Sequence, residues 1–201
     1  MIGKQEIRLA GFGGQGIILS GHILGKAAAL FEKKNAVFTQ SYGPEARGGA
    51  CSADVVISGE SIHYPKVTRP DVLVIMSQAA LTTYGETIQP GGTLILDEDL
   101  VSMPEAPEGI TMYRVPATRI AEDLGRRIVA NIAMLGAVAA LGGVVTYESM
   151  KASVKASIPP GTEELNITAF DRGYEYGVAL LESAGKAQGP ARNDAISPSG
   201  K

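Results

Sequence analysis

The sequence predicts an α/β fold, a three-layer α/β/α domain with a mainly parallel, Rossmann-like sheet in which one strand is antiparallel. Short apolar runs alternate with segments whose apolar residues recur every three or four positions, as strands alternating with helices do. Two of the runs, DVLVIM at 71–76 and TLIL at 93–96, are continuous, as expected for strands covered on both faces. A glycine-rich loop follows the first strand and opens the first helix.

The elements expected in chain order are six strands and six helices. The strand around Val55 is expected to run antiparallel, because only a turn separates it from the following segment. Residues 1–183 are expected to form a single domain, and 184–201, which are small or polar and aperiodic, a disordered tail. The strands are predicted at 6–10, 36–39, 53–58, 71–76, 93–96 and 112–115, and the helices at 17–31, 77–84, 117–124, 128–141, 147–157 and 169–183.

Composition and charge exclude several classes of function. The chain has 18 basic and 21 acidic residues and no basic stripe interleaved with aromatics, so nucleic acid is not expected as a partner. Its single cysteine, Cys51, excludes an internal disulfide and an iron–sulfur cluster held by this chain alone, which needs about four thiolates. The first residues do not resemble a signal peptide, and a buried helix explains the apolar stretch 128–145 better than a membrane span. A cytoplasmic protein without membrane contact is predicted.

The loop GFGGQG is the first candidate binding element. Gly11, Gly13 and Gly16 have the GxGxxG spacing, and the loop leads directly into a helix whose amino end offers free N–H groups. This arrangement favours an anion held by the loop backbone. The alternative is that the glycines only permit close packing of the helix on the sheet.

The residues after the second strand argue against NAD as that anion. A dinucleotide fold places an acidic residue there to hold the ribose. Here the second strand ends in Thr39, Gln40 and Ser41, and Glu32 precedes the strand instead.

The segment SYGPEARGG, at 41–49, is the second candidate element. By topology it leaves the same sheet edge as the glycine loop, where open α/β sheets bind ligands. Arg47 could hold a phosphate or carboxylate through two hydrogen bonds. The alternative is an exposed pair of Arg47 with Glu45, which would contribute little.

Four segments together resemble the gamma subunit of 2-oxoacid:ferredoxin oxidoreductases. They are GFGGQG, SYGPEARGG, YPKVTRPDVLVIMSQAA and NIAMLGAVAAL, and the resemblance runs from about Ile7 to Leu181. Ser41-Tyr42 before GPE and Tyr64-Pro65 are closest to the 2-oxoglutarate type. The candidate cofactor-binding residues are Gly11, Gly13, Gly14, Gln15, Gly16, Ser41, Tyr42, Gly43, Pro44, Glu45, Arg47, Gly48, Gly49, Ser77, Gln78 and Asn131.

The resemblance implies a reaction and a division of labour. A 2-oxoacid, coenzyme A and oxidised ferredoxin give acyl-CoA, carbon dioxide and reduced ferredoxin. Alpha and beta subunits, with a ferredoxin-like delta subunit in some complexes, are the implied partners. They carry thiamine diphosphate, magnesium and the iron–sulfur clusters, while this chain closes the thiamine site and helps to bind coenzyme A. The isolated chain is expected to be inactive, and no catalytic residue and no metal ligand is assigned to it.

Two other functions stay open. One is a stand-alone nucleotide-binding regulatory module, and the other is a purely structural assembly subunit whose glycine loops hold a partner. The carboxylates of Asp97, Glu98 and Asp99 follow a strand and could bind magnesium, although an acidic loop that caps the next segment is favoured. Asn131 lies in an otherwise apolar helix and needs hydrogen-bond partners, either a loop backbone or an adjoining subunit.

Overall fold

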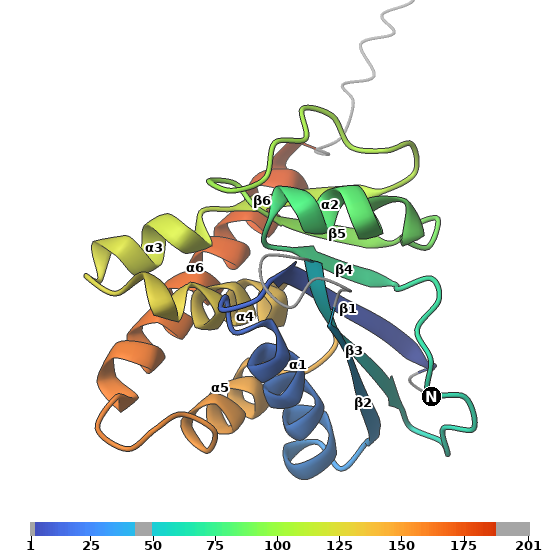
Figure 1. Cartoon of the computed structure of the whole chain (residues 1–201), viewed down its shortest axis with the longest axis horizontal. Helices are drawn as coiled ribbons and strands as arrows, with labels where there is room; N and C mark the ends of the chain where they lie inside the picture. The colour runs from blue at the N-terminus through green and yellow to red at the C-terminus, as the bar shows by residue number, and fades with distance from the viewer. Residues whose placement is uncertain (1–2, 43–49, 188–201) are drawn as a thin grey trace, which may run out of the picture.

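A computed structural model describes residues 3–42 and 50–187, with side chains up to residue 184. Its centre is a six-stranded sheet in the order β2-β3-β1-β4-β5-β6 (Figure 1). The neighbours β1, β4, β5 and β6 are parallel, while β3 runs antiparallel to both β1 and β2. The mainly parallel sheet and the antiparallel strand around Val55 are therefore confirmed. The strands are β1 (Gln5–Phe12), β2 (Asn35–Tyr42), β3 (Ala50–Ser58), β4 (Val72–Ile75), β5 (Thr93–Asp97) and β6 (Thr111–Val115).

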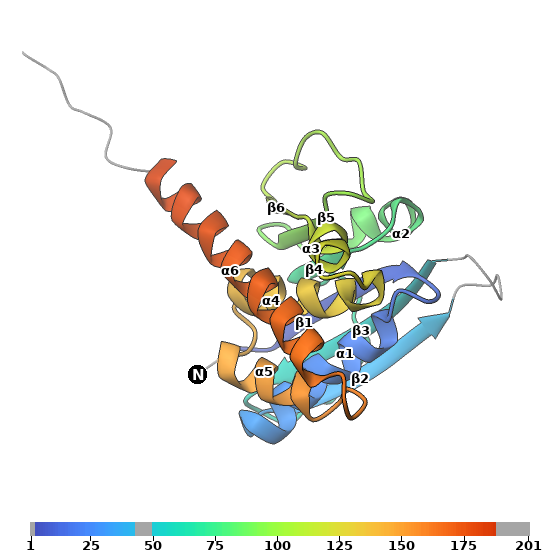
Figure 2. The ribbon, with the colours of Figure 1, turned by 90° about the vertical axis from the view of Figure 1, so that its left-hand side faces the viewer.

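Helices cover the sheet on both faces, which confirms the three layers. α1 and α4 pack on one face with α5 and α6 against α4, and α2 lies on the other face (Figures 1 and 2). The helices are α1 (Ile17–Lys26), the π-helix η1 (Ala27–Phe31), α2 (Gln78–Tyr84), the 3-10 helix η2 (Gly85–Thr87), α3 (Ala117–Asp123), the 3-10 helix η3 (Arg127–Val129), α4 (Ala130–Leu141), α5 (Tyr147–Lys155) and α6 (Glu163–Ala187).

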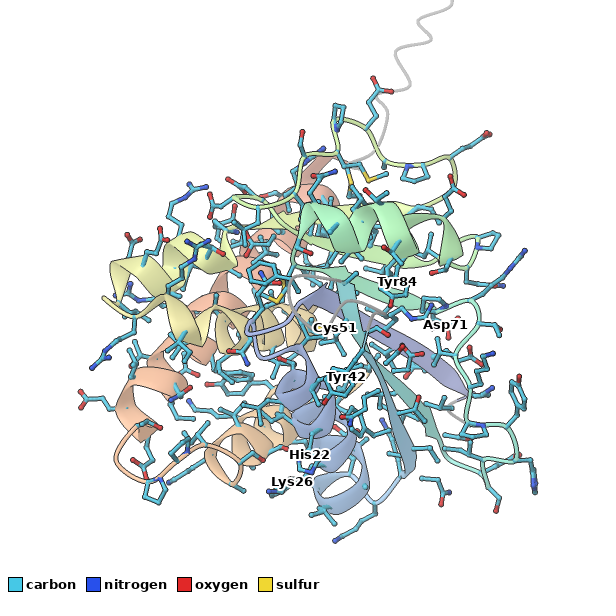
Figure 3. The ribbon with its side chains drawn as sticks, viewed as in Figure 1. His22, Lys26, Tyr42, Cys51, Asp71 and Tyr84 are labelled. Carbon is cyan, nitrogen blue, oxygen red and sulfur yellow. The ribbon has the colours of Figure 1, made fainter. Side chains whose placement is uncertain are left out.

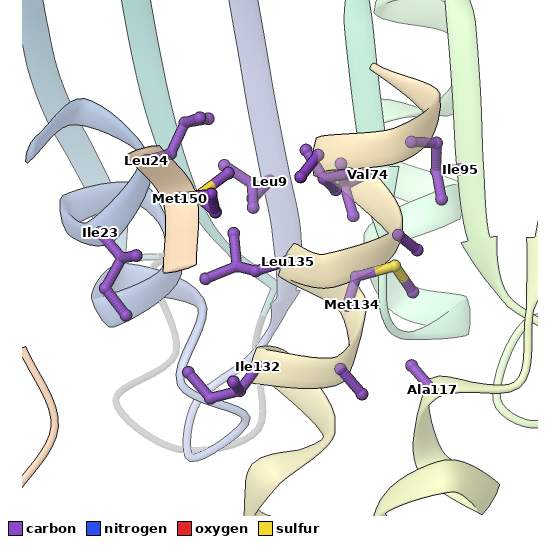
Figure 4. Packing of buried hydrophobic residues seen from close by; sticks show 14 of the residues in the cluster. Leu9, Ile23, Leu24, Val74, Ile95, Ala117, Ile132, Met134, Leu135 and Met150 are labelled. Atoms are coloured by element: carbon purple, nitrogen blue, oxygen red, sulfur yellow. The ribbon is translucent and has the colours of Figure 1, made fainter. Parts of the chain in front are cut away.

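Alternate residues of the parallel strands supply two hydrophobic cores. Leu9, Val74 and Ile95 point to the face that α4 covers, where they pack with Met134 and Leu135 (Figure 4). Leu73, Ile75 and Leu96 point to the other face and pack with Ala80 of α2. Each of these large side chains contributes roughly 1.5–3 kcal/mol on burial. Because both faces are buried, the strands are apolar throughout, as the continuous runs predicted.

α4 and α6 pack with their backbones in contact. A Cβ at Gly136 would lie 2.0 Å from the carbonyl oxygen of Phe170, and one at Gly173 would lie 1.8 Å from that of Ala133. Glycine is required at both positions because any side chain would separate the helices. The prediction that this last helix spans 169–183 is wrong at both ends, because it begins at Glu163 and continues to Ala187. Its polar first turn suits the helix dipole but carries no apolar signal.

A buried ion pair fixes the face of the sheet opposite α1. Nε of Arg8 donates to Oδ1 of Asp54 at 2.7 Å, and Nη2 donates to Oδ2 at 2.6 Å and to the Val67 carbonyl at 2.9 Å. The guanidinium also lies 5.1 Å from the ring centroid of Tyr84, labelled in Figure 3. Burial lowers the pKa of Arg8, but the Asp54 carboxylate outweighs this effect and raises it. The pair joins β1 to β3 and holds the segment before β4.

Candidate functional site

The glycine loop leaves the carboxyl end of β1 and turns into α1. Gly14 and Gly16 have φ of 100° and 75°, a backbone region that favours glycine. No side chain of the described residues caps α1 at Gly16, whose carbonyl accepts the first helical hydrogen bond from the Ser20 amide at 2.9 Å. The predicted strand–loop–helix context is confirmed.

The side chain of Gln15 turns inward and connects two strands. Its Oε1 accepts from the Phe12 amide at 2.8 Å, and its Nε2 donates to the Met76 carbonyl at 2.6 Å. Met76 directly follows β4, the parallel neighbour of β1. After β1 the chain forms β2 and β3 on one side of β1 and then β4 on its other side. The carboxyl ends of β1 and β4 are therefore the topological switch point, where open α/β sheets bind ligands.

Asn131 holds the other end of the glycine loop. Its Nδ2 donates to the Gly16 carbonyl at 3.3 Å, and only 4 % of the residue is exposed. Of the two partners considered for this buried amide, the loop backbone is therefore confirmed. A Cβ at Gly16 would lie only 2.4 Å from Nδ2, so glycine is needed there for packing as well as for its φ.

The glycines of the motif fall into two classes. A Cβ at Gly11 would lie 2.4 Å from Oε1 of Gln15 and 2.7 Å from Cδ1 of Ile17, so Gly11, like Gly16, makes room for neighbouring side chains. Gly13 and Gly14 are exposed, and a Cβ at either position would meet nothing within 4 Å. The packing explanation of the motif thus accounts for Gly11 and Gly16, while the backbone at 13–14 is open to a ligand or partner.

Ser77 and Gln78 lie at the same edge, at the amino end of α2. Oγ of Ser77 caps the helix by accepting from the Ala80 amide at 3.2 Å. Oε1 of Gln78 accepts from the Ser102 amide at 2.8 Å. Ser77 directly follows Met76, to which Gln15 is bonded, and both predicted residues have local structural hydrogen bonds.

A cleft of about 280 Å³ opens beside the loop. Phe12 and Ile128 are exposed at 38 % and 78 %, so both present unusual apolar surface at this cleft. The sequence gives no signal for either exposed side chain, because Phe12 lies within the glycine-rich motif and Ile128 within a continuous apolar stretch. The lining of the 280 Å³ cleft includes Phe12, Gly14, Gln15, Met76, Leu100 and Ile128. An adjoining cleft of about 390 Å³ is lined by Gln78, Glu98, Met103 and Arg114, among others.

The second candidate segment begins in β2, and the residue that follows it, Ala50, is paired with the glycine-loop residue Phe12. Ser41 and Tyr42 were predicted in a loop, but they pair with Ser52 and Cys51 and belong to β2, which corrects that prediction. The antiparallel ladder continues through them, and Tyr42 is 66 % exposed (Figure 3). Ala50, at the start of β3, is paired with Phe12. Gly43, Pro44, Glu45, Arg47, Gly48 and Gly49 lie outside the described residues.

The acidic residues at the end of β5 cap α3, which agrees with the capping role favoured by the sequence. The buried carboxylate of Asp97 accepts from the Thr118 amide at 3.2 Å and from its hydroxyl at 2.7 Å, and Asp99 pairs with Arg119 at 2.7 Å. Burial raises the pKa of Asp97, against the hydrogen bonds from Thr118 that lower it. Within residues 3–42 and 50–187, no group of three or more His, Cys, Asp or Glu is placed to hold a metal ion.

Two further features bear on the site's chemistry. Burial raises the pKa of the Cys51 thiol, which makes it a poor nucleophile. β2 contains no acidic residue, and Asp54, the β3 carboxylate paired with Thr39 in register, is held by Arg8. The described site therefore provides open backbone and apolar surface rather than a nucleophile or a ribose-binding carboxylate.

None of the helices in residues 3–42 and 50–187 combines the length and the apolar character that a membrane span requires.

Fold and site define an α/β protein with a ligand-binding edge at the switch point of its sheet. The chain belongs to the pyruvate ferredoxin/flavodoxin oxidoreductase family, whose profile matches residues 6–176. It is 57% identical over 179 residues to 2-oxoglutarate synthase subunit KorC of Methanocaldococcus jannaschii, covering 88% of this chain and 96% of that relative. The resemblance to gamma subunits is thereby confirmed.

Two solved structures share the fold. The gamma subunit of a keto/oxoacid ferredoxin oxidoreductase from Geobacter sulfurreducens is 40% identical, with a TM-score of 0.78, over 87% of this chain and 99% of that one. The 2-oxoglutarate:ferredoxin oxidoreductase of Magnetococcus marinus, whose structure holds 2-oxoglutarate, coenzyme A and succinyl-CoA, has a TM-score of 0.80 over 90% of this chain and 32% of that one. At 24% identity, this second likeness concerns the fold alone.

Proposed function

We propose that this chain is the gamma subunit of a 2-oxoglutarate:ferredoxin oxidoreductase. The complex would convert 2-oxoglutarate, coenzyme A and oxidised ferredoxin to succinyl-CoA, carbon dioxide and reduced ferredoxin. The observation that carries the proposal is the 57% identity to a 2-oxoglutarate synthase subunit across nearly the whole length of both chains. The Ser41-Tyr42 and Tyr64-Pro65 pairs had favoured the same substrate.

The proposed role is to close the thiamine site of the partner subunits and to help bind coenzyme A. Three features support a binding role without chemistry of its own. The exposed backbone at Gly13 and Gly14 is open to close approach, the neighbouring cleft is largely apolar, and Phe12 and Ile128 flank it. A coenzyme A molecule offers phosphates for backbone N–H groups and an extended arm for apolar surface.

Thiamine diphosphate, magnesium and the iron–sulfur clusters are assigned to the alpha, beta and delta partners, with ferredoxin as the electron acceptor. One cysteine in the whole chain is consistent with that assignment. The isolated chain is expected to be inactive, and a cytoplasmic location remains a prediction.

A stand-alone nucleotide-binding module is the second candidate, and the site geometry disfavours it. β2 ends in Thr39, Gln40, Ser41 and Tyr42, none of which offers the carboxylate that would hold a dinucleotide's ribose. A purely structural assembly subunit is the third. Genes for the alpha and beta subunits next to this one are expected for the first and third functions, and their absence from the genome would exclude both.

A tagged chain isolated from the native organism under anoxic conditions tests the proposal. We expect thiamine- and cluster-bearing subunits to co-purify, and the eluate to reduce viologen fastest with 2-oxoglutarate. A faster reaction with pyruvate would mean that the complex uses pyruvate and not 2-oxoglutarate as its substrate. A lone chain that binds a nucleotide and shows no such activity would favour the regulatory module.

Arg47→Ala tests the second candidate segment in the same complex. We expect an increased KM for coenzyme A or 2-oxoglutarate in an intact complex, because an arginine can hold a phosphate or carboxylate through two hydrogen bonds. The matched control is Arg69→Ala, which removes an exposed arginine shortly before β4, at the opposite edge of the sheet. Kinetic constants equal to those of the control would show that Arg47 does not bind either substrate.

A further inference from the structure

The side chain of Gln15 continues the pairing of β1 with β4 where the two backbones separate. The last backbone hydrogen bond between these segments runs from the Met76 amide to the Ala10 carbonyl, at 2.8 Å. Beyond it, the Phe12 amide and the Met76 carbonyl are joined through the Gln15 carboxamide, which accepts from the first and donates to the second. A carboxamide has the donor and acceptor of a peptide group, so it can substitute for one rung of the ladder.

The surrounding residues leave room for this one arrangement. Gly11 lies directly under the carboxamide, since a Cβ there would come within 2.4 Å of Oε1. Ser77, which follows Met76, caps α2. The bond from Gln15 to Met76 therefore fixes the glycine loop relative to the end of β4, and Gly14, Gln15 and Met76 all line the cleft.

We infer that Gln15 is a positioning residue, whose carboxamide holds the exposed backbone of Gly13 and Gly14 in place for coenzyme A. This inference rests on the proposed function. Oε1 and Nε2 each make a hydrogen bond within the chain, and in this proposal Gln15 acts through the loop backbone that these two bonds hold.

Two variants of the assembled complex test this role. Gln15→Glu keeps the shape of the side chain but, when ionised, directs a carboxylate oxygen at the Met76 carbonyl, 2.6 Å from the present nitrogen. That repulsion moves the loop and also raises the pKa of the new carboxyl. The protonated acid has one donor and one acceptor, so it restores both hydrogen bonds. Gln15→Met keeps the length of the side chain and removes both bonds at every pH.

We expect the KM for coenzyme A to rise about tenfold in both variants near pH 8, with a much smaller change in kcat, since one buried hydrogen bond corresponds to about this factor. As the pH is lowered towards about 5, the KM of Gln15→Glu should fall towards that of the wild type at the same pH, and that of Gln15→Met should not. Gln89→Glu is the matched control, because it adds the same charge at an exposed turn before β5.

Hydrogen exchange of the Phe12 amide gives a second measurement on the same complexes. In the wild type this amide is bonded to Oε1 of Gln15, and we expect it to exchange faster in Gln15→Met. Provided that the wild-type complex is active, either of two results would overturn the role of Gln15. One is a KM that is unchanged in both variants, and the other is a KM of Gln15→Glu that does not recover at low pH. Failure of both variants to assemble would also overturn it, because Gln15 would then support folding. A wild-type complex that oxidises no 2-oxoacid would instead overturn the proposed function.

Discussion

Substitution of Gly13 and Gly11 by alanine separates the function of the glycine loop from its stability. Gly13 lacks the positive φ of Gly14 and Gly16, and a Cβ there would meet nothing within 4 Å. Gly13→Ala should therefore leave the free energy of unfolding unchanged or raise it by about 0.4–1 kcal/mol, because alanine restricts the unfolded chain. At Gly11 the new Cβ would overlap Gln15 and Ile17.

The cost at Gly11 follows from that overlap. Overpacking of a buried site costs about 1–3 kcal/mol, and each Gln15 hydrogen bond that is displaced adds about 1 kcal/mol. In a chain of this size, each kcal/mol lowers Tm by about 2–4 °C. Gly11→Ala should thus lower Tm by several degrees, which thermal unfolding followed by circular dichroism can measure, while Gly13→Ala should not.

In the kinetic assay we expect an effect of Gly13→Ala even though this substitution does not destabilise the protein. A methyl group at Gly13 prevents close approach to the loop backbone, so we expect the KM for coenzyme A in the complex to rise at least about fivefold, the equivalent of one lost hydrogen bond. Wild-type kinetics in a stable Gly13→Ala complex would refute the reasoning, because the open backbone would then have no ligand. A melting temperature of Gly11→Ala equal to that of the wild type would refute the packing argument.

Three further predictions concern the framework of the site. Asn131→Ala should lower the free energy of unfolding by about 0.5–1.5 kcal/mol, because the Gly16 carbonyl loses one of its hydrogen bonds and keeps the one from the Ser20 amide; urea denaturation measures the change, and an unchanged value would mean that the 3.3 Å bond contributes little. Asp54→Ala should cost about 3–5 kcal/mol, because it leaves Arg8 buried and unpaired, and the double substitution with Arg8→Met should recover much of this loss in the same assay. Burial raises the pKa of Asp97 above its ordinary value of 3.8, so wild-type stability gains from this group as the pH falls through the raised pKa, and Asp97→Asn should lack that gain in denaturation curves recorded across this range.

Patterns within short stretches of sequence predicted the framework of the fold. The continuous apolar runs of β4 and β5 and the glycine loop between β1 and α1 are readable because burial on two faces and a tight turn each restrict the local residue types. The start of α6 at Glu163 was missed because its first turn is polar, and the extent of β2 to Tyr42 was missed because pairing with β3 decides it.

The arrangement of the candidate site was less accessible to prediction. The site elements were placed at one edge from topology, and Asn131 was expected to need a partner. The inward position of Gln15 could not be predicted, because its acceptor on Met76 lies 61 residues away. The exposure of Ile128 depends on where α4 begins, and an apolar run does not show which of its residues precede the buried part.

The bond between Asn131 and Gly16 also bears on the order in which the molecule is made. It spans 115 residues, whereas every strand of the sheet lies before residue 116. All residues of the sheet and of the link from Gln15 to Met76 are therefore synthesised before α4. Because α4 covers one face of the sheet and supplies Asn131 to the glycine loop, neither that face nor the loop can be complete until this helix has been added.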